Sequence, residues 1–449
     1  MKKRERILSG SIGKTITFLA IPIILASFLQ TVYNLTDTFW VGRLGADSVA
    51  AVSISFPIIF FLMMFVMGLS SASVILISQS FGKGNIEKTN YYASQSILWT
   101  TLLAILLTIL GIIFSKNIIN IFNLTAPVFS QAVSYLQISF YGIIFVFMYL
   151  MFTMILRGVG EVKIPLYLVL STVFLNFLLD PLFIYGFGPI SPSGVSGVAW
   201  ATIFTQGIAG FVGLFILIRG NYGVKIVKKY LRFDFSALKK ILKLGLPTAI
   251  ERSLHSFGIL FFTWMVSFFG TVAIASFGIG SKVIMLVMIP SFGLAMAVTT
   301  FMGQNIGAGK IDRAEEGSKF GLLWGFIILL IAGLFIFIFA ENFVRFFIPN
   351  DLEVIAMAGF FVKIIAFAFA FISLHVISGG AYKAAGRTGI SLLFGMIQVA
   401  LLIGFSLIAF RLGYGLNGLW FAYLFSFVIS GIVAFLWYLT GSWKRESIV

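Results

Sequence analysis

The sequence predicts an all-α polytopic membrane protein, with twelve transmembrane helices in two pseudo-symmetric six-helix lobes around a central cleft. Three observations support this fold class. The 449 residues are 60% hydrophobic and 10% charged, with a mean hydropathy of +1.07. Apolar runs long enough to cross a hydrocarbon core of roughly 30 Å recur along the whole chain, without the alternating pattern of a barrel. The second half of the sequence also repeats the first.

The apolar runs define twelve spans separated by hydrophilic loops. Their ranges are 15–41, 49–80, 93–115, 129–156, 165–187, 195–218, 244–269, 272–303, 318–340, 354–378, 388–410 and 418–441. The sequence has no cysteine, which excludes disulfides, thiolate metal sites and cysteine nucleophiles.

Basic residues gather on one side of these spans. The N-terminus, the even-numbered loops and the C-terminal tail, together with Lys319 at the start of the ninth span, hold 24 of the 31 Lys and Arg residues, whereas the opposite side holds four. Because positively charged loops remain in the cytoplasm, we expect a multi-pass protein of the cell membrane with both termini cytoplasmic. This distribution explains the net charge of +16 without a nucleic-acid partner.

A shift of 225 residues superposes the two halves of the sequence. The matched pairs are Leu19/Leu244, Pro22/Pro247, Gly45/Gly270, Ala50/Ala275, Gly68/Gly293, Gln79/Gln304, Gly82/Gly307 and Gly84/Gly309, and a shift of 226 pairs Arg157 and Gly160 with Lys383 and Gly386. Each half has an even number of spans, so both halves enter from the same side as parallel repeats. We expect an N-lobe at 1–218, a basic cytoplasmic connector at 219–243, and a C-lobe with a short tail at 244–449.

The first span carries a polar stripe. Gln30, Tyr33, Asn34 and Asp37 are spaced i, i+3, i+4 and i+7, so they share one face of a helix. An ionisable residue at membrane depth costs at least about 2.5 kcal/mol on insertion scales, and it is normally kept where it faces a wet cavity or a partner. Asp37 is therefore the leading candidate site residue.

Span 5 supplies a second acid at a similar depth. Asn176 precedes Asp180 by one helical turn, and Pro181 removes a backbone hydrogen bond there, which frees a carbonyl to face a cation. Thr202 of span 6 lies at comparable depth, so we expect these oxygen-bearing side chains to converge with Asp37. The alternative is that they only tie helices together through hydrogen bonds, and it stays open above all for Thr202.

The second half has no acids that match Asp37 and Asp180. Glu251 lies near the start of span 7, where pairing with the connector explains it equally well. His255 and His375 are candidates for a proton relay, although single histidines in helix bundles more often form packing hydrogen bonds.

These motifs resemble the multidrug and toxic compound extrusion (MATE) family, over essentially the whole chain. The matching residues are Pro22, the run Gln30-x-x-Tyr33-Asn34-x-x-Asp37-x-x-x-Val41-Gly42, the turn Gln79-x-x-Gly82-x-Gly84, Arg157-Gly158-x-Gly160, Asn176-x-x-x-Asp180-Pro181, and Ala201-Thr202. The sequence looks like the branch with an aspartate cation site in the N-lobe. Another branch has acids in spans 7 and 10, where this chain has Glu251 alone.

The resemblance implies a cation-coupled antiporter, not an enzyme, that exports bulky organic compounds, often cationic or amphipathic, by alternating access. The implied cation site, for a proton or sodium ion, comprises Asp37, Asn176, Asp180 and Thr202. The implied substrate contacts are Gln30, Tyr33, Asn34 and Tyr135, and the hinges are Pro22 and Pro181. Beyond the coupling ion we expect no cofactor or metal, and the partners are small organic substrates and the bilayer around a monomer.

A lipid-linked sugar flippase of the same superfamily is the alternative function. Such a protein needs a basic cleft for pyrophosphate, and Lys282 and Lys363 are the residues in favour of it. A membrane-embedded enzyme is a weaker alternative, because two separated histidines and no cysteine provide no metal or nucleophile cluster.

Overall fold

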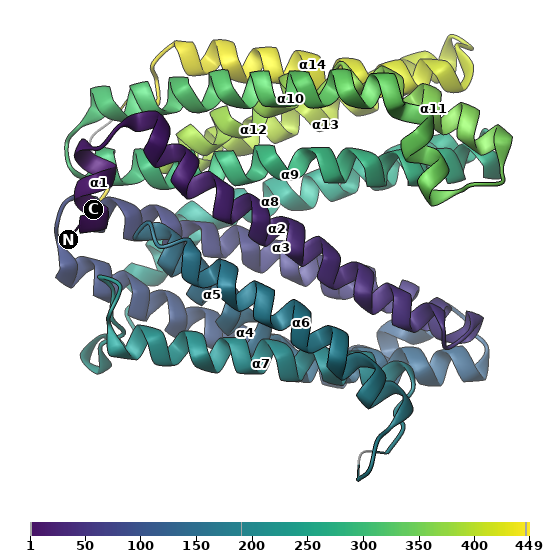
Figure 1. Cartoon of the computed structure of the whole chain (residues 1–449), viewed down its shortest axis with the longest axis horizontal. Coiled ribbons are helices and arrows are strands. Elements are labelled where there is room, and N and C mark those ends of the chain that lie inside the picture. Colours follow the sequence, from purple (N-terminus) through teal and green to yellow (C-terminus); the bar gives the residue numbers. More distant parts are fainter. Residues whose placement is uncertain (1, 190, 445–446) are drawn as a thin grey trace. The chain divides into compact units, whose positions relative to one another are not determined.

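The computed structural model describes residues 2–189, 191–444 and 447–449, and most of them are helical (Figure 1). The helices of the first half are α1 (Lys2–Ser9), α2 (Ile12–Gly42), α3 (Ala46–Gly82), α4 (Ile86–Asn120), α5 (Ala126–Gly158), α6 (Lys163–Tyr185) and α7 (Val195–Arg219). Those of the second half are α8 (Phe235–Ser267), α9 (Thr271–Gly307), α10 (Ile311–Phe347), α11 (Leu352–Ala366), α12 (Phe369–Ala384), α13 (Thr388–Arg411) and α14 (Gly415–Leu439), after the short 3-10 helix η1 (Lys228–Tyr230).

Helix boundaries repeat between the halves as the sequence predicts. Helices α3 and α9 are both 37 residues long and begin 225 positions apart. The turns before them also match, because Gly45 has a φ of 99° and Gly270 a φ of 92°. Glycine adopts a positive φ with little steric strain, whereas residues with a Cβ atom are strained there. The same holds after these helices at Gly84 (82°) and Gly309 (74°), which confirms tight turns at both positions.

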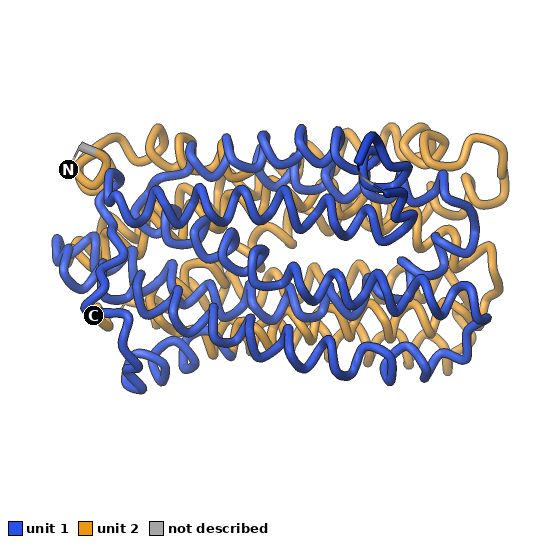
Figure 2. The backbone as a smooth tube through the Cα atoms, turned by 90° about the horizontal axis from the view of Figure 1, so that it is seen from below, with its two compact units in different colours: residues 1, 25–246 blue, residues 2–24, 247–449 orange. Residues whose placement is uncertain are grey.

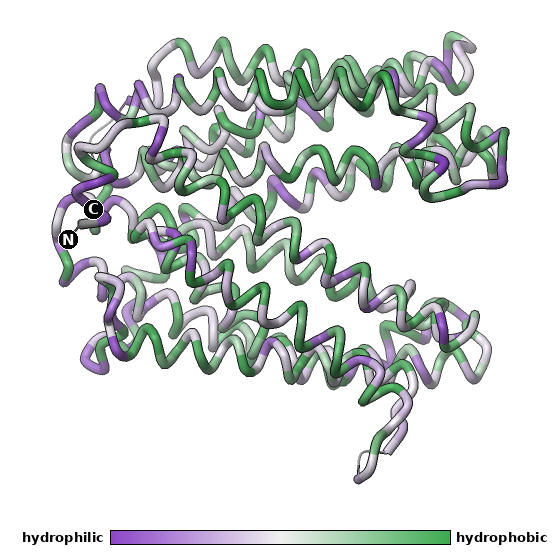
Figure 3. Tube along the Cα trace, in the orientation of Figure 1, coloured by the Kyte–Doolittle hydropathy of each residue, from purple (hydrophilic) through white to green (hydrophobic). Residues whose placement is uncertain are grey.

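The protein is a multi-pass membrane protein. Ten of its described helices are long and apolar enough to cross a membrane. Figure 3 shows hydrophobic residues along the middles of the long helices and hydrophilic residues mainly near their ends. Helix α8 spans 33 residues but is interrupted by Glu251, Arg252 and His255, so it is not among the ten.

The tenth predicted span, 354–378, is not one straight helix. It is divided into α11 and α12, which are bent by 53° between Ala366 and Phe369. The predicted range covers parts of both helices, and the sequence gives no sign of the bend because hydropathy measures the length of an apolar run alone. The corresponding helix of the first half, α5, is continuous over 33 residues.

The basic connector is folded onto α4. The Gln95 side chain donates hydrogen bonds to the carbonyls of Tyr230 (2.6 Å) and Arg232 (2.8 Å). Asp234 accepts a hydrogen bond from the Tyr91 hydroxyl, and its Oδ1 accepts another from the Ser236 amide at 2.9 Å. Asp234 thereby caps α8, which begins at Phe235, within the interval predicted as connector.

Two compact units divide the described helices, and the division falls inside α2 (Figure 2). Residues 25–246 form one unit, and residues 2–24 join 247–449 in the other. Close packing accounts for the second grouping, since a Cβ on Gly293 of α9 would lie 2.4 Å from the Ile24 side chain. Helix α1 belongs to the same unit, where Lys310 donates a hydrogen bond to the Leu8 carbonyl at 2.9 Å.

Candidate functional site: a buried carboxylate pair

The second half of α2 places the predicted polar stripe within the 25–246 unit. Tyr33 is 3% exposed, and Gln30 and Asp37 are half-buried. Asn34 lies at an exposed position, and neither its side chain nor that of Gln30 makes a hydrogen bond within the described ranges. Helical geometry thus keeps the stripe on one side of α2, but only Tyr33 and Asp37 reach the packed interior.

Helix α6 supplies the second acid. Asn176 and Asp180 are both fully buried, and the Asn176 Nδ2 donates a hydrogen bond to the Asp180 Oδ1 at 3.1 Å across one helical turn. Pro181 follows directly and lies inside the helix. Because proline has no amide hydrogen, one carbonyl of the preceding turn lacks its helical partner beside these side chains.

The Asp37 side chain lies close to Asn176 and Asp180, so the structure brings the two predicted carboxylates together. Asp37 and Asp180 interact electrostatically, and Asn176 lies beside the Asp37 carboxylate. The two acids are 143 positions apart in the sequence. Although distant in the sequence, the two carboxylates are close in space. They repel each other there unless a proton or a metal cation neutralises part of their charge.

Three buried oxygen atoms at this site have no hydrogen-bond partner among the described residues. They are Oδ1 of Asp37, Oδ1 of Asn176 and Oδ2 of Asp180. Leaving a buried acceptor unsatisfied costs about 1–3 kcal/mol, and charged groups cost more. Oxygen atoms of this kind are the ligands that a hard cation prefers, and the carboxylates can equally hold a proton.

Helix α7 contributes two threonines rather than the single one expected. The Tyr33 hydroxyl lies 2.9 Å from Oγ1 of Thr205, which is fully buried, and Thr202 also lies within reach of this hydroxyl. Thr202 therefore lies near the Tyr33 hydroxyl, while Thr205 forms the hydrogen bond with it. The sequence contained a signal for Thr205, because it follows Thr202 by three positions and shares its helix face.

Tyr135 of α5 completes the described surroundings of the carboxylates. It is 9% exposed and interacts electrostatically with both Asp37 and Asp180. It packs with Val41 and Ile184, near the ends of α2 and α6. The structure therefore gathers Tyr33, Tyr135 and the acids, while Gln30 and Asn34 lie outside this group.

The second unit contains a different polar cluster. The Glu251 Oε1 pairs with the Lys383 Nζ at 2.9 Å, and its Oε2 accepts a hydrogen bond from the Ser391 hydroxyl at 3.0 Å. His255 and His375 both interact electrostatically with Glu251. Glu251 thus has a cationic partner within its own unit, unlike the acids of α2 and α6.

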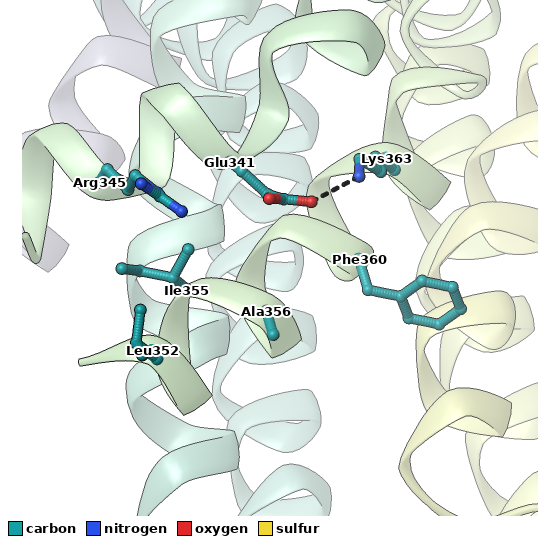
Figure 4. Close-up of a pocket in the computed structure, with 7 residues that line it drawn as sticks. All are labelled: Glu341, Arg345, Leu352, Ile355, Ala356, Phe360 and Lys363. Atoms are coloured by element: carbon teal, nitrogen blue, oxygen red, sulfur yellow. Dashed lines mark hydrogen bonds and ion pairs between the residues drawn. The ribbon is translucent and has the colours of Figure 1, made fainter.

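A surface pocket of about 290 Å³ lies elsewhere in the second unit, at the junction of α10 and α11 (Figure 4). It is lined by Glu341, Arg345, Leu352, Ile355, Ala356, Phe360 and Lys363. Glu341 and Lys363 form an ion pair of 2.7 Å within it. The pocket contains none of the predicted site residues except Lys363, whose charge is already paired.

Repeated membrane-spanning helical halves are the architecture of many membrane transporters. The MatE family model matches residues 22–182 and 247–408, one match in each half, and the chain belongs to this family. The predicted family is therefore confirmed, and with it membership of a family of transporters. The branch with an N-lobe aspartate site remains a prediction.

Several known proteins are similar over nearly their whole length. The probable multidrug resistance protein YpnP of Bacillus subtilis is 29% identical over 440 residues, which cover 98% of this chain and 97% of YpnP. The probable multidrug resistance protein NorM of Thermotoga maritima is 27% identical, with coverages of 98% and 94%. A crystal structure of MATE in complex with MaL6 superposes with a TM-score of 0.91 at 24% identity, covering 97% of each chain, and confirms the predicted fold class.

Proposed function

We propose that the protein exports organic compounds in exchange for protons or sodium ions, and that the ion binds at Asp37 and Asp180. The observation that carries this proposal is the convergence of the two acids with Asn176 inside the unit of residues 25–246. The names of the relatives, which describe multidrug resistance proteins, support drug-like substrates. The basic loops support a cell-membrane location with both termini in the cytoplasm.

The cation site explains how the exchange is coupled. With Asp37 and Asp180 ionised, the unit bears an uncompensated charge that favours binding of a cation. Cation binding neutralises the pair and removes the repulsion between the two carboxylates. The conformation of α2 that holds them together therefore becomes more stable. If substrate binds better to the other conformation, each ligand weakens the other by the same factor.

Helix α2 is the element through which we expect this change to pass. Pro22 lies within the helix, two residues before the division between the two units at Ile24 and Leu25. Proline removes one backbone hydrogen bond and makes bending there less costly than elsewhere in a helix. Asp37 lies in the part of α2 that belongs to the 25–246 unit, whereas the first part of α2 belongs to the other unit. A change at Asp37 therefore acts on a helix that both units share.

Charge pairing in the second unit favours export over the alternative of a lipid-linked sugar flippase. Lys363 is paired with Glu341 at 2.7 Å. Lys282 lies 5.9 Å from the centre of the Phe347 ring. A flippase would need cations gathered at one site for a pyrophosphate, whereas at the predicted site the described groups without a charged partner are Asp37 and Asp180, which favour a cation.

Efflux driven by separate ion gradients tests the proposed function. Proteoliposomes containing the full chain are loaded with a fluorescent organic cation, and an inward proton gradient or an inward sodium gradient is imposed in turn. We expect at least one of the gradients to accelerate efflux. A chain that exports equally well with neither gradient would contradict cation coupling.

Substitution of each acid then tests the site. Asp37→Asn and Asp180→Asn keep the size of the side chain and remove its charge, so we expect gradient-driven efflux to fall by at least about tenfold while equilibrium substrate binding persists. Asp47→Asn is the matched control, because Asp47 is exposed at the start of α3. Wild-type efflux in both site variants would show that the ion binds elsewhere.

A further inference from the structure

A line of polar side chains continues from the carboxylate pair toward the end of α5. Tyr149, Thr153 and Arg157 are spaced four residues apart, so they lie along one face of that helix. Tyr149 and Thr153 are each 4% exposed. Among the described residues, the Tyr149 hydroxyl, the Thr153 hydroxyl and the Arg157 Nε have no hydrogen-bond partner of good geometry.

Packing within the 25–246 unit connects this line to the site. Tyr149 packs with Ala26 of α2 and Ala209 of α7, one to two turns from the bonded pair Tyr33 and Thr205 on the same helices. Gln206 lies between these levels on α7, is 4% exposed, and has an Oε1 without a partner in the described part of the chain. A polar column thus runs along the interior from the carboxylates past Tyr149 to Arg157.

The internal repeat shows what is unusual about Arg157. Its counterpart in the second half is Lys383, which pairs with Glu251 at 2.9 Å. The position equivalent to Glu251, 225 residues earlier, is Ala26. The second half therefore neutralises the repeated cation, whereas the first half has no acid at the corresponding place.

The residues around these positions are consistent with this difference. Gly395 leaves room beside Glu251, since a Cβ there would lie 3.1 Å from the Glu251 Cγ. The equivalent position in the first half is Val169, which packs with Ala26 and Tyr149. Apolar side chains thus fill the space that the counter-ion occupies in the other repeat, and no acid among the described residues pairs with Arg157.

Buried polar groups without protein partners are places where ordered water is found. A chain of water beside carboxylates conducts protons readily unless something opposes them. In membrane channels a fixed arginine opposes protons and cations in this way. Arginine suits this role because it keeps its charge at every physiological pH.

We propose that the column is hydrated, and that Arg157 is an electrostatic barrier that prevents protons and sodium ions from passing between the carboxylate site and the cytoplasm through the N-lobe. Ion exchange is then restricted to the conformational cycle. This inference rests on the proposed function and on the expected orientation, in which Arg157 lies at the cytoplasmic end of α5. It predicts a gain of ion leak, which loss of transport alone would not produce.

A leak assay tests the barrier. Proteoliposomes with the full chain receive a pH gradient without substrate, and a pH-sensitive dye follows its collapse. We expect Arg157→Gln to collapse the gradient on the order of tenfold faster than the wild type, because a fixed charge is removed from a weakly screened interior. Arg157→Lys keeps the charge and should remain sealed. Arg219→Gln, at an exposed position at the end of α7, is the second control.

A double variant shows the route of the leak. Adding Asp180→Asn to Arg157→Gln should reduce the leak toward the wild-type rate, because the route passes the carboxylates. A sealed Arg157→Gln, a leak equally fast in Arg157→Lys, or a leak unchanged by Asp180→Asn would each overturn the barrier. Efflux measured in wild-type vesicles separates the two proposals. If the wild type shows gradient-driven efflux and Arg157→Gln does not leak, the barrier is rejected while the proposed function stands.

Discussion

The Tyr33 hydroxyl and the Thr205 hydroxyl lie 2.9 Å apart, although 172 positions separate them in the sequence. Thr205 also donates to the Ala201 carbonyl of its own helix at 3.0 Å, so its oxygen is left to accept from Tyr33. The bond fixes the second half of α2 against α7 one turn from Asp37. Tyr33 therefore positions the carboxylate of its own helix.

Tyr33→Phe removes the hydroxyl and keeps the ring. We expect the unfolding free energy to fall by about 1 kcal/mol, the usual net value of one hydrogen bond, and the affinity for the coupling ion to fall because Asp37 is less firmly held. The measurement is thermal unfolding in detergent together with the ion concentration that gives half-maximal efflux. An unchanged half-maximal concentration would show that Tyr33 does not position the site.

The Glu251–Lys383 pair predicts a strong asymmetry between single and double variants. Each side chain is 19% exposed, and removing one partner of a buried pair costs about 3–5 kcal/mol because the other charge stays buried. We expect Glu251→Gln and Lys383→Met each to lower the melting temperature markedly. The double variant should recover much of the loss, and equal losses in all three would contradict mutual neutralisation.

Asp234 predicts a pH-dependent connector. The hydrogen bond from the Tyr91 hydroxyl holds the pKa of Asp234 below its usual range. A lowered pKa in the folded state stabilises the connector at pH values above the unfolded pKa of about 3.9, and this stabilisation is lost as the pH falls through the folded value. Hydrogen exchange of residues 225–237, corrected for intrinsic rates, should therefore accelerate below about pH 4.

The control for the connector is Asp234→Asn. It should already exchange faster at neutral pH and show little further change on acidification. A wild-type connector that stays equally protected at both pH values would indicate that the Gln95 hydrogen bonds alone are sufficient to hold it.

Gly197 predicts a packing defect that reaches the site helices. A Cβ at this position of α7 would lie 2.5 Å from the Phe183 carbonyl of α6, and backbone cannot move aside as a flexible side chain can. We expect Gly197→Ala to cost about 2 kcal/mol or more in stability. Gly404→Ala, in α13 with no atom within 4 Å of the added Cβ, should be neutral or slightly stabilising.

The spans and the repeat could be predicted because both are properties of short stretches. Length and hydropathy predict a helix that crosses a membrane, and matching glycines predict matching turns, as Gly45 and Gly270 confirm. The break between Ala366 and Phe369 could not be predicted, since no proline or glycine marks it. Helix α8 begins at Phe235 because Asp234 caps it. The sequence predicted a connector up to residue 243, since hydropathy does not detect a helix cap.

The acids of the site could also be predicted, because a charged residue within an apolar span is conspicuous. Their partners were harder to find. The polar stripe predicted Tyr33 but not Thr205, and only the fold shows that their hydroxyls meet. Likewise, the pairing of Lys363 with Glu341 joins two helices whose relation the sequence does not contain.

The division of the packing units inside α2 limits how the protein can be built from fragments. A cut in the connector gives one polypeptide that carries residues 2–24 and a second that carries the helices with which those residues pack. The second fragment alone therefore lacks a helix of its own core, and supplying residues 2–24 as a separate peptide, or moving them by circular permutation to its beginning, should restore it. The two halves repeat each other in sequence, yet the second half alone is not a complete packing unit.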